Sequence, residues 1–261
     1  MQNTTAGNKG SIQRKAVRGA PTELYGLKWY ALRMDNYEEW QRYKSVLLAR
    51  QTTFPVSYIA LPFLEAIFEI EISVIEETGS SAGFMYSIMK LLALSLHLGD
   101  DAINKDLRIT VQDRKLIGLS IRNGAEDILI TKDMFPELRK LIAWQNGDEI
   151  PDESLNDELL ETEKDLAERN APDLNWDVED MKASVALNLK LRIKDIDEMT
   201  ILEFDLMRRA IDRNKRFEIC ANGQYQGAKW ENGNPYPSWM FDRNKNGSGA
   251  LVSPSKFRGK Q

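Results

Sequence analysis

The chain has 261 residues, with 35 basic and 40 acidic side chains, a net charge of −5, and 42% hydrophobic residues. This composition is typical of a globular protein that is long enough to bury a sizeable core. Its single cysteine, Cys220, excludes an internal disulfide. Cys220 and the single histidine, His97, are too few to build a zinc site of the common Cys/His type.

The first 21 residues combine positive charge with a low apolar content. Four basic side chains and no acid lie in residues 1–21: Lys9, Arg14, Lys15 and Arg18. Because no hydrophobic run is present, we expect a flexible basic arm, disordered or ordered by a partner, and not a targeting peptide. The most apolar stretches, 58–75 and 84–98, are interrupted by charges or shorter than the roughly 20 residues of a membrane helix. We therefore expect core segments and a cytoplasmic location.

An amphipathic helix is predicted over residues 36–50, where Trp40, Tyr43 and Leu47 recur at helical spacing and Asp35 precedes them as a cap. Residues before it, from Leu24 to Met34, alternate loosely and indicate an edge strand or a lead-in.

Two apolar segments follow. Residues 64–75 fit a strand, because Phe68, Ile70, Ile72 and Val74 fall on a period of two, and they fit a helix equally well. Both alternatives stay open. Residues 84–98 are apolar nearly all round, which predicts a central helix that ends at Gly99.

The hydrophobic period changes over residues 107–131. Alternating segments are separated by Asp113-Arg114 and by Asn123-Gly124, the second of which is a strong hairpin signal, so we expect a three-stranded antiparallel meander. A helix capped by Asp133 and ending at Asn146-Gly147 is predicted to follow it. Residues 22–147 are thus expected to be a helical region that contains the meander.

The rest of the chain divides by composition. Residues 148–180 hold 14 acidic side chains against two basic ones, so we expect 148–176 to be an exposed acidic connecting segment. Residues 177–223 predict a helical pair, with Thr200 and Glu203 forming a capping box at the start of the second helix. Residues 224–261 form an aromatic and basic tail. The predicted fold class is mainly α with a small antiparallel β meander, an α+β chain.

The candidates for chemistry favour structural roles. His97 has leucine neighbours and no convergent nucleophile motif, and Cys220 is expected to be a core residue. Residues 242–247 match the opening of a calcium loop, but Ser253 stands where a bidentate Glu is needed, which favours a plain turn. The glycines around Ser80 and Ser81 lack the lysine of a phosphate loop. We therefore expect no enzyme, no catalytic residue, no metal and no cofactor.

Four aromatic side chains in the tail are the predicted partner-binding residues: Trp230, Tyr236, Trp239 and Phe241. Such a set in loop composition either folds back on the chain or inserts into another protein, where Trp and Tyr are typical of interface hot spots. The basic arm and tail also suggest nucleic acid, but the net acidic chain has no recognised reading module, so protein docking is favoured.

The order of elements in the second half resembles proteins from the tail gene clusters of tailed bacteriophages. The likeness covers roughly residues 107–261. It rests on the meander, the strings from Phe135 to Asn146 and from Glu149 to Glu153, the acidic helix, the segment from Met199 to Phe204, and Trp239-Met240. The resemblance implies a tail-morphogenesis role without catalytic residues. The N-terminal arm has no counterpart in it.

These observations together predict a noncatalytic phage tail assembly protein that acts through protein–protein contacts. It would be either a tail-assembly chaperone for the tape-measure protein or a minor structural tail or baseplate component. The expected partners are tape-measure, tube or baseplate proteins, with self-association as a further expectation. The expected location is the host cytoplasm during assembly, or the virion tail. The alternative is a nucleic-acid-binding or enzymatic factor of the infected cell.

Overall fold

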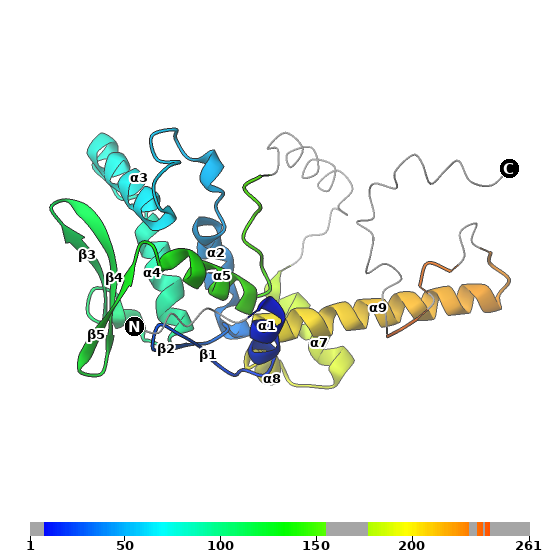
Figure 1. Ribbon diagram of the computed structural model, residues 1–261. Coiled ribbons are helices and arrows are strands. Elements are labelled where there is room, and N and C mark those ends of the chain that lie inside the picture. The colour runs from blue at the N-terminus through cyan, green and yellow to red at the C-terminus, as the bar shows by residue number, and fades with distance from the viewer. Residues whose placement is uncertain (1–7, 155–176, 230–233, 237, 241–261) are drawn as a thin grey trace, which may run out of the picture. The chain divides into compact units, whose positions relative to one another are not determined.

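A computed structural model describes residues 8–154, 177–229, 234–236 and 238–240 (Figure 1). Helices and two small antiparallel sheets give the α+β fold that the sequence predicts. The chain forms two compact units, an N-terminal unit up to Asp205 and a C-terminal unit from Leu206 onward. This boundary falls inside one helix, so it differs from the division at residues 176 and 223 expected from composition.

The predicted flexible arm is wrong for residues 9–17, which form helix α1 (Lys9–Val17). Asn8 caps the helix by accepting a hydrogen bond from the Ser11 amide at 2.9 Å. Ile12 and Ala16, four residues apart, are buried, and α1 packs on helix α5. Arg14 and Lys15 are exposed on the helix and Arg18 follows its end, so the short apolar stripe is hidden in a composition that resembles a disordered arm.

A hairpin of two short strands lies where the sequence indicated an edge strand or a lead-in after the arm. Strand β1 (Thr22–Leu24) pairs with β2 (Leu27–Trp29) across Tyr25 and Gly26, which both adopt positive φ, as in a tight hairpin turn. The Tyr25 hydroxyl donates to Glu137 Oε2 at 3.0 Å, and burial followed by this carboxylate raises the pKa of Tyr25 to about 12. The hairpin is therefore fixed to α5.

Helix α2 (Tyr37–Leu47) confirms the predicted amphipathic helix, with Trp40 and Leu47 buried. Asp35 does not cap it. A 3-10 turn, η1 (Met34–Asn36), precedes the helix, and the residue in the capping position is Asn36, without a side-chain cap.

The segment left open between strand and helix is helix α3 (Phe63–Thr78). It packs against α4 (Phe84–Ser95), the predicted central helix, and α4 also contacts α2. Helix α4 ends before Gly99, because His97 adopts the left-handed conformation at φ 56°. Another short 3-10 turn, η2 (Gln51–Thr53), lies between α2 and α3.

The predicted meander is confirmed. Strands β3 (Leu107–Gln112), β4 (Lys115–Asn123) and β5 (Glu126–Thr131) form an antiparallel sheet in the order β3-β4-β5, next to a 3-10 turn, η3 (Asp100–Ala102) (Figure 1). Helix α3 packs on β4. Gly118 sits where a Cβ atom would lie 2.1 Å from the Ile130 carbonyl oxygen, so the close approach of β4 to β5 requires glycine.

Helix α5 (Phe135–Gln145) lies at the centre of the N-terminal unit. Arg139 is buried on it, donates to the carbonyl oxygens of Leu47 and Ala49, and lies 3.7 Å from the centroid of the Phe63 ring. Burial lowers the pKa of Arg139 to about 10, against the opposing effect of Glu153, so the guanidinium stays charged at neutral pH.

The acidic connecting segment is described only at its edges, because residues 155–176 lie outside the described residues. Its first residues are fixed to the N-terminal unit. Asp148 accepts hydrogen bonds from Trp40 Nε1 at 3.1 Å and Lys44 Nζ at 3.2 Å, and the Glu153 carboxylate accepts from the Gln51 amide at 3.0 Å.

Three helices follow where a helical pair was expected: α7 (Val178–Leu189), the short α8 (Ile193–Asp197) and α9 (Ile201–Tyr225). The Glu203 amide donates to the Thr200 hydroxyl at 3.1 Å, which is one half of the predicted capping box. Helix α9 continues two residues past the expected end at Gly223.

Candidate functional site

Two of the four predicted partner-binding residues, Tyr236 and Trp239, lie in the described part of the C-terminal unit. Trp230 and Phe241 lie outside the described residues. Arg216 Nη1 on α9 donates to the Tyr236 hydroxyl at 2.8 Å, and the guanidinium carbon lies 5.6 Å from the centroid of the ring. Arg213 Nε donates to the Trp239 carbonyl oxygen at 3.0 Å. The segment around these aromatics is thus fastened to α9.

The fastening residues form one stripe along α9. Arg213, Arg216, Cys220 and Gln224 recur at helical spacing, and Gln224 accepts a hydrogen bond from Asn234 Nδ2 at 3.1 Å. The sequence alone did not indicate Arg213 or Arg216 as functional residues. The spacing of three and four residues was the signal that could have found this stripe, but nothing in the sequence says that residues 234–240 lie against it.

Exposed apolar side chains adjoin this stripe on α9 and occur in the segment that it binds. Trp239 is 55% exposed although its carbonyl group is held, Ile219 is 70% exposed, and Tyr225 is 95% exposed. Met240, Leu206 and Met207 are also exposed. Arg216 pairs with Asp212 at 2.8 Å, and the hydrogen bonds that it donates to Asp212 and Tyr236 raise the pKa of Arg216, which keeps the guanidinium charged. This surface combines Trp, Tyr, Met and Arg, the residue types enriched at protein interfaces.

We name this surface the α9 face. It comprises the exposed apolar residues Ile219, Tyr225, Trp239 and Met240 and four cations of α9: Arg209, Arg213, Lys215 and Arg216.

His97 does not assemble with a nucleophile among the described residues. It stacks on Tyr30, with ring centroids 4.2 Å apart. Partial burial and then Arg33 lower the pKa of His97, and the opposing effect of Asp35 is smaller, so the imidazole is neutral at pH 7. Cys220 is buried, as expected of a core residue.

A groove of about 390 Å³ lies beside the same tyrosine. It is lined by the β1–β2 hairpin, by leucines after α4 and by Ile121, Arg122 and Asn123 of β4. Its aliphatic lining residues are Leu27, Leu96, Leu98 and Ile121.

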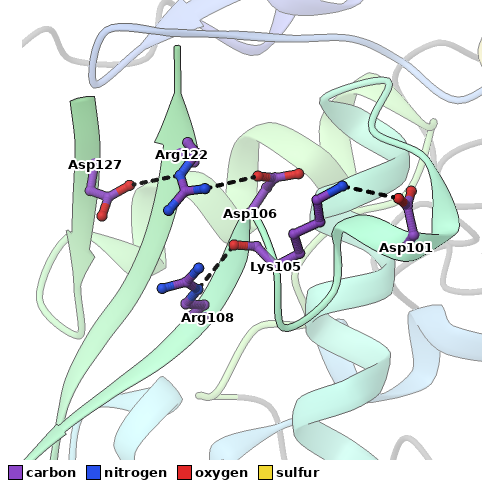
Figure 2. Close-up of polar contacts among 6 residues, drawn as sticks. All are labelled: Asp101, Lys105, Asp106, Arg108, Arg122 and Asp127. Carbon is purple, nitrogen blue, oxygen red and sulfur yellow. Dashed lines mark hydrogen bonds and ion pairs between the residues drawn. The ribbon is translucent and has the colours of Figure 1, made fainter. Parts of the chain in front are cut away.

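The charge of Arg122 in this groove is already balanced. Figure 2 shows its guanidinium between two carboxylates, with Nη1 at 3.9 Å from Asp106 Oδ1 and Nε at 3.7 Å from Asp127 Oδ1. Nearby, Lys105 reaches Asp101 at 3.4 Å, and Arg108 Nε donates to the Lys105 carbonyl oxygen at 3.0 Å. These three cations are engaged within the fold, so Arg122, the arginine that lines the groove, does not offer an uncompensated charge to an anion.

The N-terminus of α4 is occupied by a side chain of the protein. The buried carboxylate of Glu71 accepts hydrogen bonds from the Ser81 hydroxyl and from the amides of Gly83 at 3.0 Å, Phe84 at 2.6 Å and Met85 at 3.3 Å. Burial alone would raise the pKa of Glu71, but these hydrogen bonds outweigh it and lower the pKa. The loop therefore binds its own carboxylate in the place where a phosphate group would bind.

The remaining candidates bear on metals and membranes. In the part of the chain that the structure describes, no group of three or more His, Cys, Asp or Glu side chains is arranged to hold a metal. Residues 242–247, the calcium-loop candidate, lie outside the described residues. Among the helices described, none combines the length and the apolar character that crossing a bilayer requires.

Comparison of the chain with protein-family models, with curated proteins and with solved structures finds no match.

Proposed function

We propose that this protein is a noncatalytic assembly factor of a bacteriophage tail, which acts by binding other tail proteins through the α9 face. It is either a chaperone that keeps the tape-measure protein soluble or a minor component of the tail or baseplate. It works in the host cytoplasm during assembly, and as a component it remains in the virion tail. The phage context of this proposal comes from the resemblance in the second half of the chain.

The observation that carries the binding role is the exposure of Trp239 and its neighbours on a framework that hydrogen bonds hold in place. An exposed tryptophan, tyrosine, isoleucine and methionine on one small unit have an energetic cost in water that contact with a partner removes. Because the backbone at Trp239 is already tied to Arg213, less conformational entropy is lost on binding.

Quantitative mass spectrometry of purified virus particles and of infected-cell lysate tests the proposal. A fixed copy number in particles supports a structural component, and abundance in lysate with absence from particles supports a chaperone. If the chain follows tail proteins in neither preparation, the proposal is refuted.

A binding experiment tests the surface itself. The full chain is expected to capture tail proteins from lysate, and a chain that lacks residues 224–261 is expected to capture none. The full chain with Trp239→Ala is expected to bind them at least tenfold more weakly, as for an interface hot spot. Leu187→Ala is the matched control, because Leu187 is 80% exposed on the N-terminal unit. Equal capture by the Trp239 variant and the control would refute the assigned surface.

Nucleic acid is the second candidate, because the C-terminal unit carries 11 basic side chains against four acidic ones. A titration with duplex DNA over a series of salt concentrations tests it. Phosphate contacts would make the affinity fall steeply with salt, and binding that is undetectable at about 0.05 M salt would exclude this candidate.

A further inference from the structure

The two units carry opposite net charges. The N-terminal unit, residues 1–205, holds 24 basic and 36 acidic side chains, a net charge of −12. The C-terminal unit, residues 206–261, holds 11 basic and four acidic side chains, a net charge of +7. The overall charge of −5 hides this separation. Units of opposite sign on one chain give every copy a surface that attracts another copy.

Part of the positive charge of the C-terminal unit lies on the helix that also exposes apolar groups, because residues 206–225 of α9 carry five basic and two acidic side chains. Arg209 and Lys215 of α9 are exposed, and the Lys215 ammonium lies 4.0 Å from its acidic neighbour Glu218, at the limit of an ion pair. Lys215 lies one helical turn before the exposed Ile219, and Arg209 lies one turn before Arg213, which binds the Trp239 carbonyl group. Cations and apolar anchors are therefore neighbours along this helix. A partner for this face must therefore supply carboxylates around apolar surface.

The N-terminal unit has a hollow of that kind. A cavity of about 210 Å³ lies where η1 and the first turn of α2 meet the first turn of α7. Four carboxylates line it, those of Asp35, Glu38, Glu39 and Glu179. The other lining residues are Met34, Tyr37, Val178 and one cation, Lys182. We name it the acidic hollow.

The cation in the acidic hollow does not balance its charge. Lys182 Nζ lies 2.8 Å from Glu179 Oε1 and 2.8 Å from Asp197 Oδ1, so its charge is shared with a carboxylate outside the lining. These hydrogen bonds and charges outweigh burial and raise the pKa of Lys182, which keeps it protonated. The carboxylates of Asp35, Glu38 and Glu39 therefore leave an excess of negative charge that an arginine or lysine would neutralise.

We propose that the α9 face of one copy docks on the acidic hollow of a second copy, in a head-to-tail contact. The inference rests on the proposed function in that it names a second copy of this chain as a partner of the same surface. Each copy has one face of each sign, so the contact is heterologous and extends into rings or filaments. A second copy fits better than an unrelated acidic protein, since both complementary surfaces occur on this chain.

Sedimentation equilibrium of the full chain tests the contact. The weight-average mass is expected to exceed 29.9 kDa at about 0.05 M salt and to fall toward that value at about 0.5 M, because salt screens exposed charges. The double variant Arg209→Glu with Lys215→Glu is expected to weaken self-association by about tenfold or more.

A matched control makes the same change of net charge elsewhere. Lys115→Glu with Lys194→Glu alters two exposed lysines of the N-terminal unit. This control is expected to keep or strengthen self-association, because it makes the N-terminal unit more acidic. Circular dichroism and urea titration establish that each variant folds, and a variant that does not fold is replaced by the milder Arg209→Gln with Lys215→Gln.

Mixing two variants separates contacts between copies from contacts within one chain. Glu38→Gln with Glu179→Gln weakens the acidic hollow, and this variant alone is expected to self-associate weakly. Mixed with the Arg209 and Lys215 reversal variant, it still offers an intact α9 face to an intact acidic hollow. The expected product is a 1:1 complex that does not grow further.

Three results would overturn the inference: a monomer at every salt concentration, equal weakening by the matched control, or charge-dependent binding of duplex DNA by a chain that stays monomeric. The first two leave the proposed function undecided, because the mass spectrometry of particles and lysate is independent of self-association. The third supports the nucleic-acid candidate. Conversely, a chain absent from tails that still forms the salt-sensitive head-to-tail contact would refute the proposed function and leave this inference standing.

Discussion

Replacement of Glu71 by glutamine tests whether this carboxylate holds the N-terminus of α4. Each oxygen of the Glu71 carboxylate accepts two hydrogen bonds, one from Ser81 and Gly83 and the other from Phe84 and Met85. Glutamine has one acceptor oxygen, so its NH2 group must face one of these two pairs of donors, which then lose their acceptor. Each lost hydrogen bond to a charged acceptor contributes about 1.5–3 kcal/mol, and partial rearrangement of the amide reduces the sum. We expect Glu71→Gln to lower the free energy of unfolding by about 2–4 kcal/mol.

Urea denaturation of the full chain at pH 7, followed by circular dichroism, measures this change. The control is Glu76→Gln, since Glu76 is exposed on the same helix, and its free energy of unfolding is expected to stay within about 0.5 kcal/mol of the wild type. A Glu71 variant as stable as the Glu76 variant would refute the capping role.

The pH dependence has a definite sign. The pKa of Glu71 is lower in the folded protein than its ordinary value of 4.5. The ionised carboxylate therefore stabilises the fold fully above pH 4.5, and this contribution is lost as the pH falls through the lowered pKa. The stability difference between the wild type and Glu71→Gln should shrink over that acidic range. A difference that stays constant from pH 7 to pH 3 would contradict the reasoning.

Three further substitutions test the core of the N-terminal unit, each by urea denaturation. Gly118→Ala places a Cβ atom 2.1 Å from the Ile130 carbonyl oxygen and should cost about 3 kcal/mol or more by separating β4 from β5; a wild-type midpoint would contradict it. Arg139→Met leaves two backbone carbonyl groups without their donor and should cost about 2–6 kcal/mol, at about 1–3 kcal/mol for each unsatisfied group. Ile12→Ala should lower the free energy of unfolding by about 2–4 kcal/mol and make α1 more sensitive to protease than in the wild type. If residues 9–17 were a flexible arm, the substitution would change neither the stability nor the protease sensitivity.

The sequence predicts the meander and the amphipathic helices well because their signals are local. Asn123-Gly124 makes the β4–β5 turn with Gly124 at φ 66°, and the alternation on either side of it sets the register. Trp40 and Leu47 are buried at the spacing that predicted α2. In both cases one short stretch of chain contains the turn or the periodicity and also the residues that satisfy it.

The misses come from contacts distant in sequence. In α3 the even-numbered apolar residues allowed a strand, and what favours the helix is packing on α4 and the use of Glu71 as a cap ten to fourteen residues ahead. For α1, burial of Ile12 depends on α5, more than 100 residues away. Amino-acid composition does not indicate either contact, because a charged residue counts the same in the composition whether it lies in a solvated loop or caps a helix.

The aromatic tail shows why the two alternatives left by the sequence do not exclude each other. Tyr236 folds back, because its hydroxyl has a polar partner in Arg216. Trp239 is held only through its carbonyl group by Arg213, and its ring remains 55% exposed. A tryptophan whose backbone is anchored but whose ring is exposed loses little freedom when a partner covers it. The hydrogen bonds to α9 therefore order the segment and leave the Trp239 ring exposed. Whether an aromatic ring folds back or stays exposed depends on whether an arginine of α9 donates to its side chain, as at Tyr236, or to its backbone, as at Trp239.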